Sequence, residues 1–440
     1  MLNKVALLLC FFFIWYLFRS DKTQSKGVSK ATWIPLIWMS IAGSRFVSNW
    51  LHPGTTVSAS TFSEGSPIDR AVFLFLIIAG VLVLKKRKVS WKALYKSNPW
   101  VWFYFLFGLV SVVWSDLPFV ALKRWGKGLG NVIMVMVLLT EAEPYKAVEN
   151  VLRKLAFILV PSSVLLVKYF PNLGRAYHMG LPMATGVATH KNTLGAVCLA
   201  SGIYFCWMFL YGKVERAGLA GKIRILLYSA IAIMIVWLFY KADSATSLFS
   251  MVVALVILSL SRIPPLRQNL RKTILCIMVL FGIVFAAEMT FGLKDKVIVL
   301  LGREPSLTTR VPMWKDLISM VHNPVLGYGY DSFWMGDRQR IIGEKWAIRG
   351  NAHNGYLEMY LNLGLVGVSF ILAWIVSGLR RIWLQANFDF SVGVLRLAFL
   401  FIAAIYSYTE AAFYGVSLVW VLLLLGIMDP PEQARLVSNE

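Results

Sequence analysis

The segment NAHNGYLEMYLNLGLVGV, residues 351 to 368, begins with a polar cluster that contains His353 and continues directly into an apolar stretch. A histidine at this junction has three possible roles: a base that takes a proton near neutral pH, an anchor in lipid headgroups, or a polar group at a helix start. Asn351 or Asn354 is expected to cap the helix, and Glu358 lies one turn after Asn354, where the two side chains could pair. The choice depends on which other groups reach the same side of the membrane.

A second polar cluster, THKNTLGAV at 189 to 197, also opens an apolar stretch. His190 and Asn192 are residues that could cap a helix. Lys191 falls in the first helical turn, where a cation opposes the helix dipole but suits a bound phosphate. An anion site and a lysine that snorkels to the interface are equally good interpretations of Lys191.

The segment LGREPSLTTRVPMW at 301 to 314 supplies Arg303 and Arg310 among residues that favour turns. An arginine presents a planar fork of donors that suits the oxygens of a diphosphate. The alternative is a pair of solvated surface arginines.

Aromatic residues cluster in the same region of the chain. The segment NPVLGYGYDSFW at 323 to 334 contains Tyr328 and Tyr330, and Trp314 precedes it. Flat aromatic faces beside polar groups suit sugar rings, although an aromatic belt at the membrane interface explains them nearly as well. We expect these aromatic residues to contact a glycan or an acceptor, together with the polar residues His190, Asn192, Asn354, Glu358 and Glu410.

Two more charged groups lie at the ends of apolar stretches. Lys123 and Arg124 are adjacent near the start of one stretch, and neighbouring residues of a helix cannot face the same way. At least one of them is therefore expected to point into the helix bundle, and both are candidates to bind the diphosphate of the substrate. Glu410 lies near the end of another stretch, where an acid usually has a partner or a role.

Several chemistries are disfavoured by missing motifs. The chain contains no DxD, HExxH, GxSxG, GxGxxG or Walker motif, and its histidines and cysteines do not have the spacing of metal ligands. We therefore expect no metal ion and no nucleotide cofactor. Arg, Lys and His side chains gathered beside lipid point instead to a substrate that carries phosphates and a lipid tail.

The elements that position these residues are membrane helices. Of the 440 residues, 58% are hydrophobic and only 15% are charged, a composition far from that of soluble globular proteins. We expect an all-α integral membrane protein with about twelve or thirteen transmembrane helices. The predicted spans are 2–18, 32–51, 69–84, 98–115, 119–139, 151–170, 191–211, 223–240, 245–261, 273–291, 355–378, 395–411 and 415–427. The first run lacks a cleavage site and is expected to be a retained helix, although it could be interfacial.

The net charge of +22 identifies the sides of the membrane. Positive charges cluster at 19–30, 85–96, 212–224, 262–272 and 379–396, as in cytoplasmic loops. Alternation then places all five histidines outside, together with one large loop of about 60 residues from Gly292 to Asn354. We expect residues 1–440 to form a single membrane domain whose outer loop, 292–354, carries the active site. Nucleic-acid binding is disfavoured because no basic segment belongs to a soluble domain.

Three of the quoted segments, GREPSLTTRVPMW, PVLGYGYDSFW and NAHNGYLEMYLNLGLVG, together resemble the O-antigen ligase and polymerase family of Wzy/WaaL-like membrane glycosyltransferases, and look closest to ExoQ-like exopolysaccharide production proteins. WSDLP and THKNTLG fit the same pattern, so the resemblance covers about residues 100 to 425. Thr309 and Val311 depart from it, because relatives often have glycine and threonine there.

The resemblance implies a GT-C-like enzyme of the bacterial inner membrane that transfers a glycan from undecaprenyl diphosphate to an acceptor glycan on the periplasmic side. It implies that His353 is the base and that Arg310 holds the diphosphate, without a metal ion. Other polysaccharide assembly proteins are possible partners. Polymerase and ligase differ only in the acceptor, and the ExoQ-like pattern favours a polymerase. A lipid-linked glycan transporter or flippase is an alternative that predicts broken helices in matching halves, and a non-catalytic assembly scaffold is a further alternative.

Overall fold

The computed structural model describes residues 2–22, 24–53, 65–178, 181–212, 218–267, 270–279, 310–346, 350–413 and 415–431. The protein is an all-α integral membrane protein, as predicted, with one short β-hairpin in the described part. The helices are α1 (Leu2–Ser20), α2 (Trp33–Ala42), α3 (Val47–Leu51), α5 (Pro67–Lys86), α6 (Trp91–Ser97), α7 (Pro99–Val110), α8 (Pro118–Leu139), α9 (Pro144–Tyr169), α10 (Pro171–Gly174), α11 (Lys191–Leu210), α12 (Gly218–Ala242), α13 (Ala245–Leu260), α14 (Pro264–Arg267), α17 (Arg310–Ser319), α18 (Gly336–Trp346), α19 (Gly355–Ala386), α20 (Phe390–Thr409) and α21 (Leu418–Ile427).

Short 3₁₀ helices at Lys30–Thr32 and Ser111–Trp114 precede α2 and follow α7. Strands β1 (Arg175–His178) and β2 (Leu181–Ala184) pair antiparallel, with Arg175 opposite Ala184.

Local sequence explains where the helices start. Proline occupies the first turn of α5, α7, α8 and α9, where its missing N–H costs nothing. Ser244, Asn354 and Asp389 cap α13, α19 and α20 by accepting hydrogen bonds from backbone N–H groups. These caps set the helix registers and therefore the positions of the residues at the helix ends.

Every predicted span that falls within the described residues corresponds to helix. Among the described residues, seven helices are long and apolar enough to cross a membrane, and the bent pair α6–α7 would make eight. The predicted number was higher because several predicted spans form shorter or interrupted helices: 32–51 contains α2 and the separate α3, and the apolar α13 and α21 have fewer than 18 residues. Residues 280–291 of the predicted span 273–291 lie outside the described residues.

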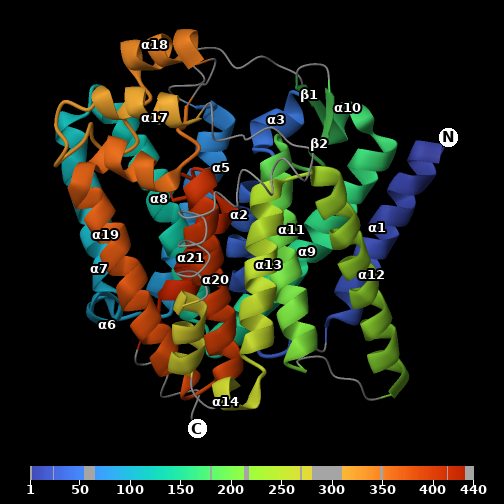
Figure 1. The fold of residues 1–440 in the computed structure, drawn as a ribbon. Helices are drawn as coiled ribbons and strands as arrows, with labels where there is room; N and C mark the ends of the chain where they lie inside the picture. The colour runs from blue at the N-terminus through green and yellow to red at the C-terminus, as the bar shows by residue number, and fades with distance from the viewer. Residues whose placement is uncertain are drawn as a thin grey trace.

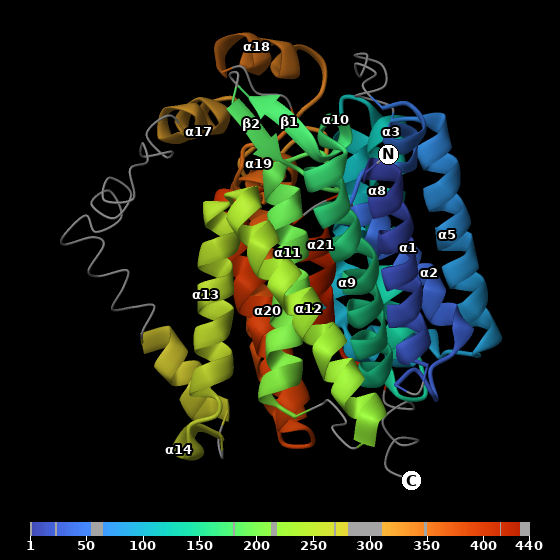
Figure 2. The same cartoon turned by 90° about the vertical axis from the view of Figure 1, so that its right-hand side faces the viewer.

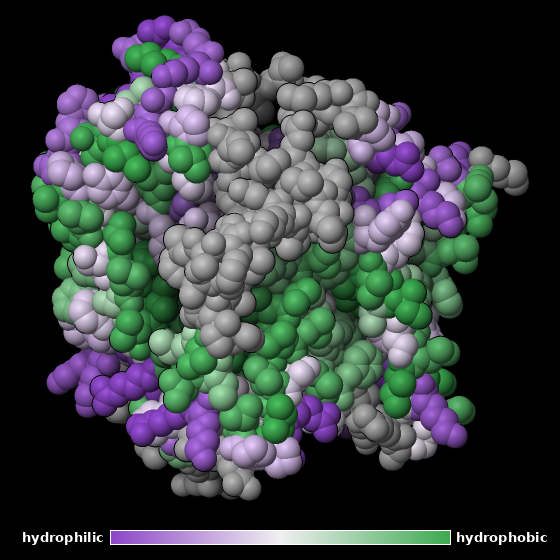
Figure 3. Space-filling model, in the orientation of Figure 1, coloured by the Kyte–Doolittle hydropathy of each residue, from purple (hydrophilic) through white to green (hydrophobic). Residues whose placement is uncertain are grey.

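The helices form one bundle whose connections separate into two ends (Figures 1 and 2). Helices α3, α10, α17 and α18 and the β-hairpin lie at one end, and α6 and α14 lie at the other. Figure 3 shows a hydrophobic band between hydrophilic ends on the face in view. This pattern is the one expected of a bundle that spans a membrane.

The bundle core contains two buried ion pairs as well as apolar side chains. Asp21, after α1, accepts a hydrogen bond from Arg153 of α9 at 2.5 Å, and both side chains are at least 96% buried. Arg396 of α20 forms a second pair with Asp429 at 2.9 Å. Because a buried charge is tolerated only with a partner, these pairs connect segments that are distant in the sequence.

Candidate functional site

The site is built on a break in α19. Gly364 has a φ of 62° and a ψ of −160°, which interrupts the helix in the middle of its apolar sequence. The N–H groups of Leu365 and Val366, which follow the break, donate to the carbonyls of Pro324 and Val325 at 2.9 and 3.2 Å. The predicted outer loop therefore supplies the hydrogen bonds that the broken helix lacks.

The same loop also donates hydrogen bonds to the helix. Tyr328 N–H donates to the carbonyl of Leu361 at 3.2 Å, and Gly329 N–H donates to that of Asn362 at 2.8 Å. A Cβ at Gly364 would collide with the carbonyl of Val325. Glycine is thus required at Gly364 both by the positive φ and by the close approach of the loop backbone.

A buried carboxylate joins this loop to the residue before His353. Glu358 is fully buried and accepts hydrogen bonds from Trp334 Nε1 at 3.0 and 2.9 Å. It also accepts from the backbone N–H of Ala352 and from Asn362 Nδ2, the latter at 3.3 Å. We call Glu358, Trp334 and Asn362 the polar latch. Because Ala352 immediately precedes His353, the latch fixes the backbone position from which the His353 side chain extends.

Backbone conformation aims the histidine. His353 has a φ of 50°, which is unusual for a residue other than glycine. Its N–H donates to Asn351 Oδ1 at 3.0 Å, while Asn354 caps α19 by accepting from Tyr356 N–H at 3.0 Å. The predicted pairing of the Asn354 and Glu358 side chains is not formed, since each has the other partners described above.

The imidazole contacts an acid from another helix. His353 Nδ1 lies 3.5 Å from Glu410 Oε2, and the side chains are 32% and 15% exposed. Glu410 Oε1 accepts a hydrogen bond from Asn192 Nδ2 at 2.6 Å. A carboxylate at Nδ1 favours the tautomer with its proton on that nitrogen and leaves Nε2 as the acceptor. His353, Glu410 and Asn192, from three different helix ends, form one polar chain that we call the triad.

Cations and helix N-termini surround this triad. His190 caps α11, accepting from Asn192 N–H at 3.2 Å, and Lys191 follows in the first turn. Arg310 donates to the carbonyl of Thr409, the residue before Glu410, at 2.7 Å. Thr409 also contacts Thr246, in the first turn of α13, at 2.7 Å between the hydroxyl oxygens.

The first described turns of α11, α13, α17 and α19 thus meet at the C-terminal end of α20. Each helix N-terminus carries a partial positive charge, and a cation in the first turn adds its own charge to it. The arrangement favours an anionic ligand. Arg303 lies outside the described residues.

The two cations predicted on α8 belong to a different group. Arg124 donates to the carbonyl of Asp331 at 2.7 Å and lies 3.6 Å from its carboxylate, whereas Lys123 lies over the Phe119 ring at 4.4 Å. Burial raises the pKa of Asp331, while Arg124 and Lys127 act in the opposite direction. The predicted diphosphate cations therefore fall into two groups, and in the described part of the chain Arg310 and Lys191 are the ones connected to the triad.

The three predicted aromatic contacts also differ. Tyr330 is 4% exposed because it packs against Gly108 and Gly128, so its ring cannot contact a glycan in this conformation. Tyr328 donates to the carbonyl of Met320 at 2.7 Å. Trp314 donates to the carbonyl of Ala352 at 2.8 Å, which positions it beside His353.

One aromatic residue near the triad was not identified from the sequence. Tyr408 is 55% exposed and makes an edge contact with Trp314 at 6.5 Å between ring centroids. It lies within an apolar stretch that has the composition of a membrane span, so only its place near the end of α20, two residues before Glu410, distinguishes it.

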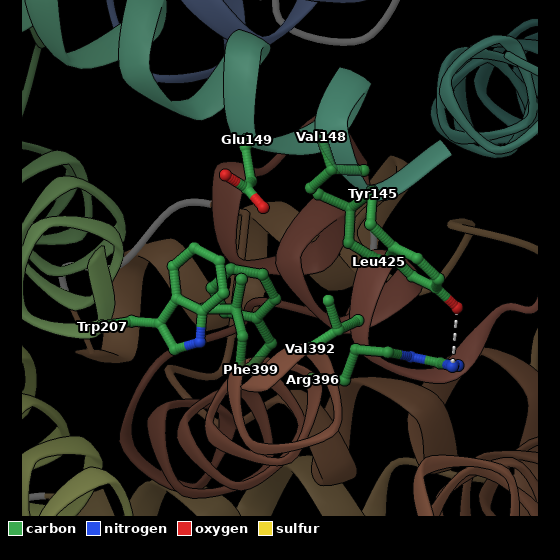
Figure 4. Close-up of a pocket in the computed structure, with 9 residues that line it drawn as sticks. Tyr145, Val148, Glu149, Trp207, Val392, Arg396, Phe399 and Leu425 are labelled. Atoms are coloured by element: carbon green, nitrogen blue, oxygen red, sulfur yellow. Dashed lines mark hydrogen bonds between the residues drawn. The ribbon is translucent and has the colours of Figure 1, made fainter. Parts of the chain in front are cut away.

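A small cavity lies elsewhere, between Tyr145, Glu149, Trp207 and Arg396 (Figure 4). Arg396 donates to the Tyr145 hydroxyl at 3.2 Å across one side of it. These residues come from the start of α9 and α20 and the end of α11. Glu410 and Asn192 of the triad lie at the opposite ends of α20 and α11, so the cavity is remote from the triad. Among the described residues, no cluster of His, Cys, Asp and Glu could hold a metal ion.

Comparisons with known proteins agree with the motifs. The family model for O-antigen ligase matches residues 229–372. The chain is 23% identical over 296 residues to the exopolysaccharide production protein ExoQ of Rhizobium meliloti, covering 64% of this chain and 65% of that protein. It is 25% identical over 211 residues to a Rickettsia conorii protein provisionally described as a polysaccharide ligase, covering 46% of this chain and 51% of that protein.

The matches therefore span less than two thirds of each relative. They confirm the predicted resemblance to the O-antigen ligase family and support a membrane protein of the polysaccharide ligase or polymerase type. The family match includes the latch, the helix break and His353, whereas Asn192 and Glu410 lie outside it.

Proposed function

We propose that this chain, with its resemblance to O-antigen ligases, is a membrane glycosyltransferase that uses an undecaprenyl-diphosphate-linked glycan as donor. We propose further that it polymerises exopolysaccharide or O-antigen repeat units in the inner membrane. The observation that carries the proposal is the contact of His353 with Glu410, which also accepts a hydrogen bond from Asn192, beside Arg310.

The charge distribution supports a periplasmic active site. The ends of α11, α19 and α20 that form the triad lie at the end of the bundle with α17 and α18 (Figure 1). The connections at the other end carry the clusters of Lys and Arg at 85–96, 262–272 and 379–396. Because cytoplasmic loops are enriched in positive charge, the triad would face the periplasm.

The geometry suits attack of an acceptor hydroxyl on a lipid-linked sugar. Nε2 of His353 would take the hydroxyl proton as the oxygen attacks the anomeric carbon. The bond from that carbon to the diphosphate oxygen would break, and Arg310, Lys191 and the helix N-termini would stabilise the charge on the departing lipid diphosphate. Glu410 would stabilise the imidazolium that forms.

The first experiment supplies the purified protein with a lipid-linked repeat unit and analyses the products. Polymerisation predicts a ladder of longer lipid-linked glycans that disappears in His353→Ala and persists in the control His52→Ala. Transfer only to an added acceptor, such as lipid A core, would identify the ligase alternative. Movement of intact donor across the bilayer without a new glycosidic bond would refute the enzyme proposal in favour of a flippase.

Metal independence is part of the proposal. The cations near the triad are side chains, and they would do the work that a metal ion does in other glycosyltransferases. We expect product formation to be unchanged in EDTA. A loss of activity that is restored by a divalent metal would contradict this part.

A further inference from the structure

A sharp bend lies at the end of the bundle remote from the triad, and we call residues 85–114 around it the elbow. Helix α6 (Trp91–Ser97) and the segment Pro99–Trp114 differ in direction by 101°. In Figure 1, α6 lies below α7, at the end that also carries α14. Because α7 runs along the bundle, α6 runs across its end.

Buried hydrogen bonds hold the corner of this elbow. Asn98, between the two helices, is 1% exposed. Its Nδ2 donates to the carbonyl of Asp429 at 3.0 Å, and its Oδ1 accepts from Asp429 N–H at 2.9 Å and from Arg381 at 2.8 Å. Segments more than 280 residues away thus fix the direction of α6.

The elbow presents an aromatic row to the outside. Trp91 and Tyr95, one turn apart, are 54% and 47% exposed, while Leu94 is 1% exposed and anchors the helix. Trp and Tyr favour the boundary between lipid headgroups and acyl chains. An in-plane helix at the end of the bundle places them at that depth.

A lysine row lies beside the aromatic row. The last turn of α5, the loop after it and α6 carry five exposed lysines: Lys85, Lys86, Lys88, Lys92 and Lys96. None of them has an ion-pair partner among the described residues, and the sequence contains no acidic residue between Asp69 and Asp116. Arg87 differs, because it is paired with Glu141 and donates to Thr140 Oγ1 at 2.8 Å. Within the part of the chain that the structure describes, the positive charge of these lysines is therefore uncompensated.

We propose that residues 85–97 form a binding surface for anionic phospholipid headgroups, with the lysines on the phosphates and Trp91 and Tyr95 at the acyl boundary. Uncompensated lysines supply the charge complementarity. The exposed aromatic row favours a lipid surface over an acidic protein segment. The reason is that α6, which carries both rings, lies between the apolar helices α5 and α7, where these helices reach the membrane boundary. The proposal is independent of the transferase reaction.

The test measures lipid selectivity of the intact protein in vesicles, using spin-labelled phosphatidylglycerol and phosphatidylcholine. Changing the five lysines of the elbow to glutamine should lower the preference for phosphatidylglycerol by about threefold or more. The reason is that each lysine near an anionic surface contributes to the binding free energy for anionic lipid. The same five positions changed to arginine should retain the preference. Unchanged thermal unfolding would show that the exposed substitutions leave the fold intact.

A matched control uses five exposed lysines outside the elbow, Lys22, Lys26, Lys30, Lys222 and Lys272, also changed to glutamine. This variant should keep most of the selectivity. An equal loss in both variants would overturn the proposal in favour of diffuse surface charge. Wild-type protein without selectivity would overturn it as well, and would leave an acidic protein partner as the candidate occupant.

Discussion

The imidazole of His353 and the carboxylate of Glu410 lie 3.5 Å apart, although 57 positions separate them in the sequence. One precedes α19 and the other ends α20, so the contact exists because these antiparallel helices pack together. Asn192 holds the second carboxylate oxygen. The proposed base therefore has an acid behind it, in an orientation that leaves Nε2 free to face a substrate.

Substitution of either member of this pair should affect the reaction differently. His353→Ala should lower turnover by about 10²- to 10⁴-fold, the usual contribution of a general base. Glu410→Gln preserves the shape but removes the charge that stabilises the protonated imidazole. It should therefore reduce maximal turnover while leaving KM for the lipid-linked donor nearly unchanged. Unchanged turnover in Glu410→Gln would contradict the positioning role.

Arg310→Lys tests whether a planar fork is needed. Lysine keeps the charge but cannot make a bidentate contact, so we expect KM for the lipid-linked donor to rise by about tenfold. The matched control is Arg340→Lys on the exposed surface of α18, where the arginine pairs with Glu344 at 3.2 Å. Equal KM values for the two variants would exclude a special contact of Arg310 with the diphosphate.

The polar latch predicts unequal costs for two similar tryptophan substitutions. Trp334→Phe removes a donor to buried Glu358 and should lower the free energy of unfolding by about 1–3 kcal/mol, as expected when a buried acceptor loses a hydrogen bond. Trp346→Phe removes a 3.0 Å bond to the more exposed Asp316, and should cost less than about 1 kcal/mol. Thermal unfolding in detergent compares the two.

The latch also predicts a kinetic effect. Because Glu358 positions Ala352, Trp334→Phe should reduce turnover more than it raises KM for the donor. If Trp334→Phe is less stable but each folded molecule turns over at the normal rate, the latch has a purely structural role.

The break in α19 predicts that Gly364→Ala is far more damaging than Gly336→Ala. Both glycines have a φ near 60°, but a Cβ at Gly336 meets open space, whereas one at Gly364 meets the backbone of Val325. The left-handed conformation alone should cost about 1–2 kcal/mol. The collision adds to this at Gly364, which we expect to abolish assembly of the site. Protease sensitivity of the loop at 323–335 provides the measurement, and equal sensitivity of the two variants would argue against the docked loop.

Local sequence was sufficient for much of the fold. Long apolar runs must be helical in a bilayer because no water is present to satisfy the backbone, and each described predicted span is helical. Capping residues and prolines also act locally, because they suit the unpaired backbone N–H groups of the first helical turn. The number of spans was overestimated because apolar runs such as 32–51 and 415–427 form short or interrupted helices. The break at Gly364 was not predicted either, since it depends on a distant loop that satisfies the exposed N–H groups.

Within the site, the sequence by itself identified the residue types: His353, Arg310, Lys191, Asn192 and Glu410 are groups that could bind an anion or move a proton, and each lies near a helix end. Tertiary structure alone decided which of them meet. It connected Glu410 with His353 and Asn192, directed Arg124 to Asp331, and buried Tyr330 and Glu358. The physical reason is that charge, capping preference and hydropathy act within a few residues, whereas contacts between side chains depend on how whole helices pack.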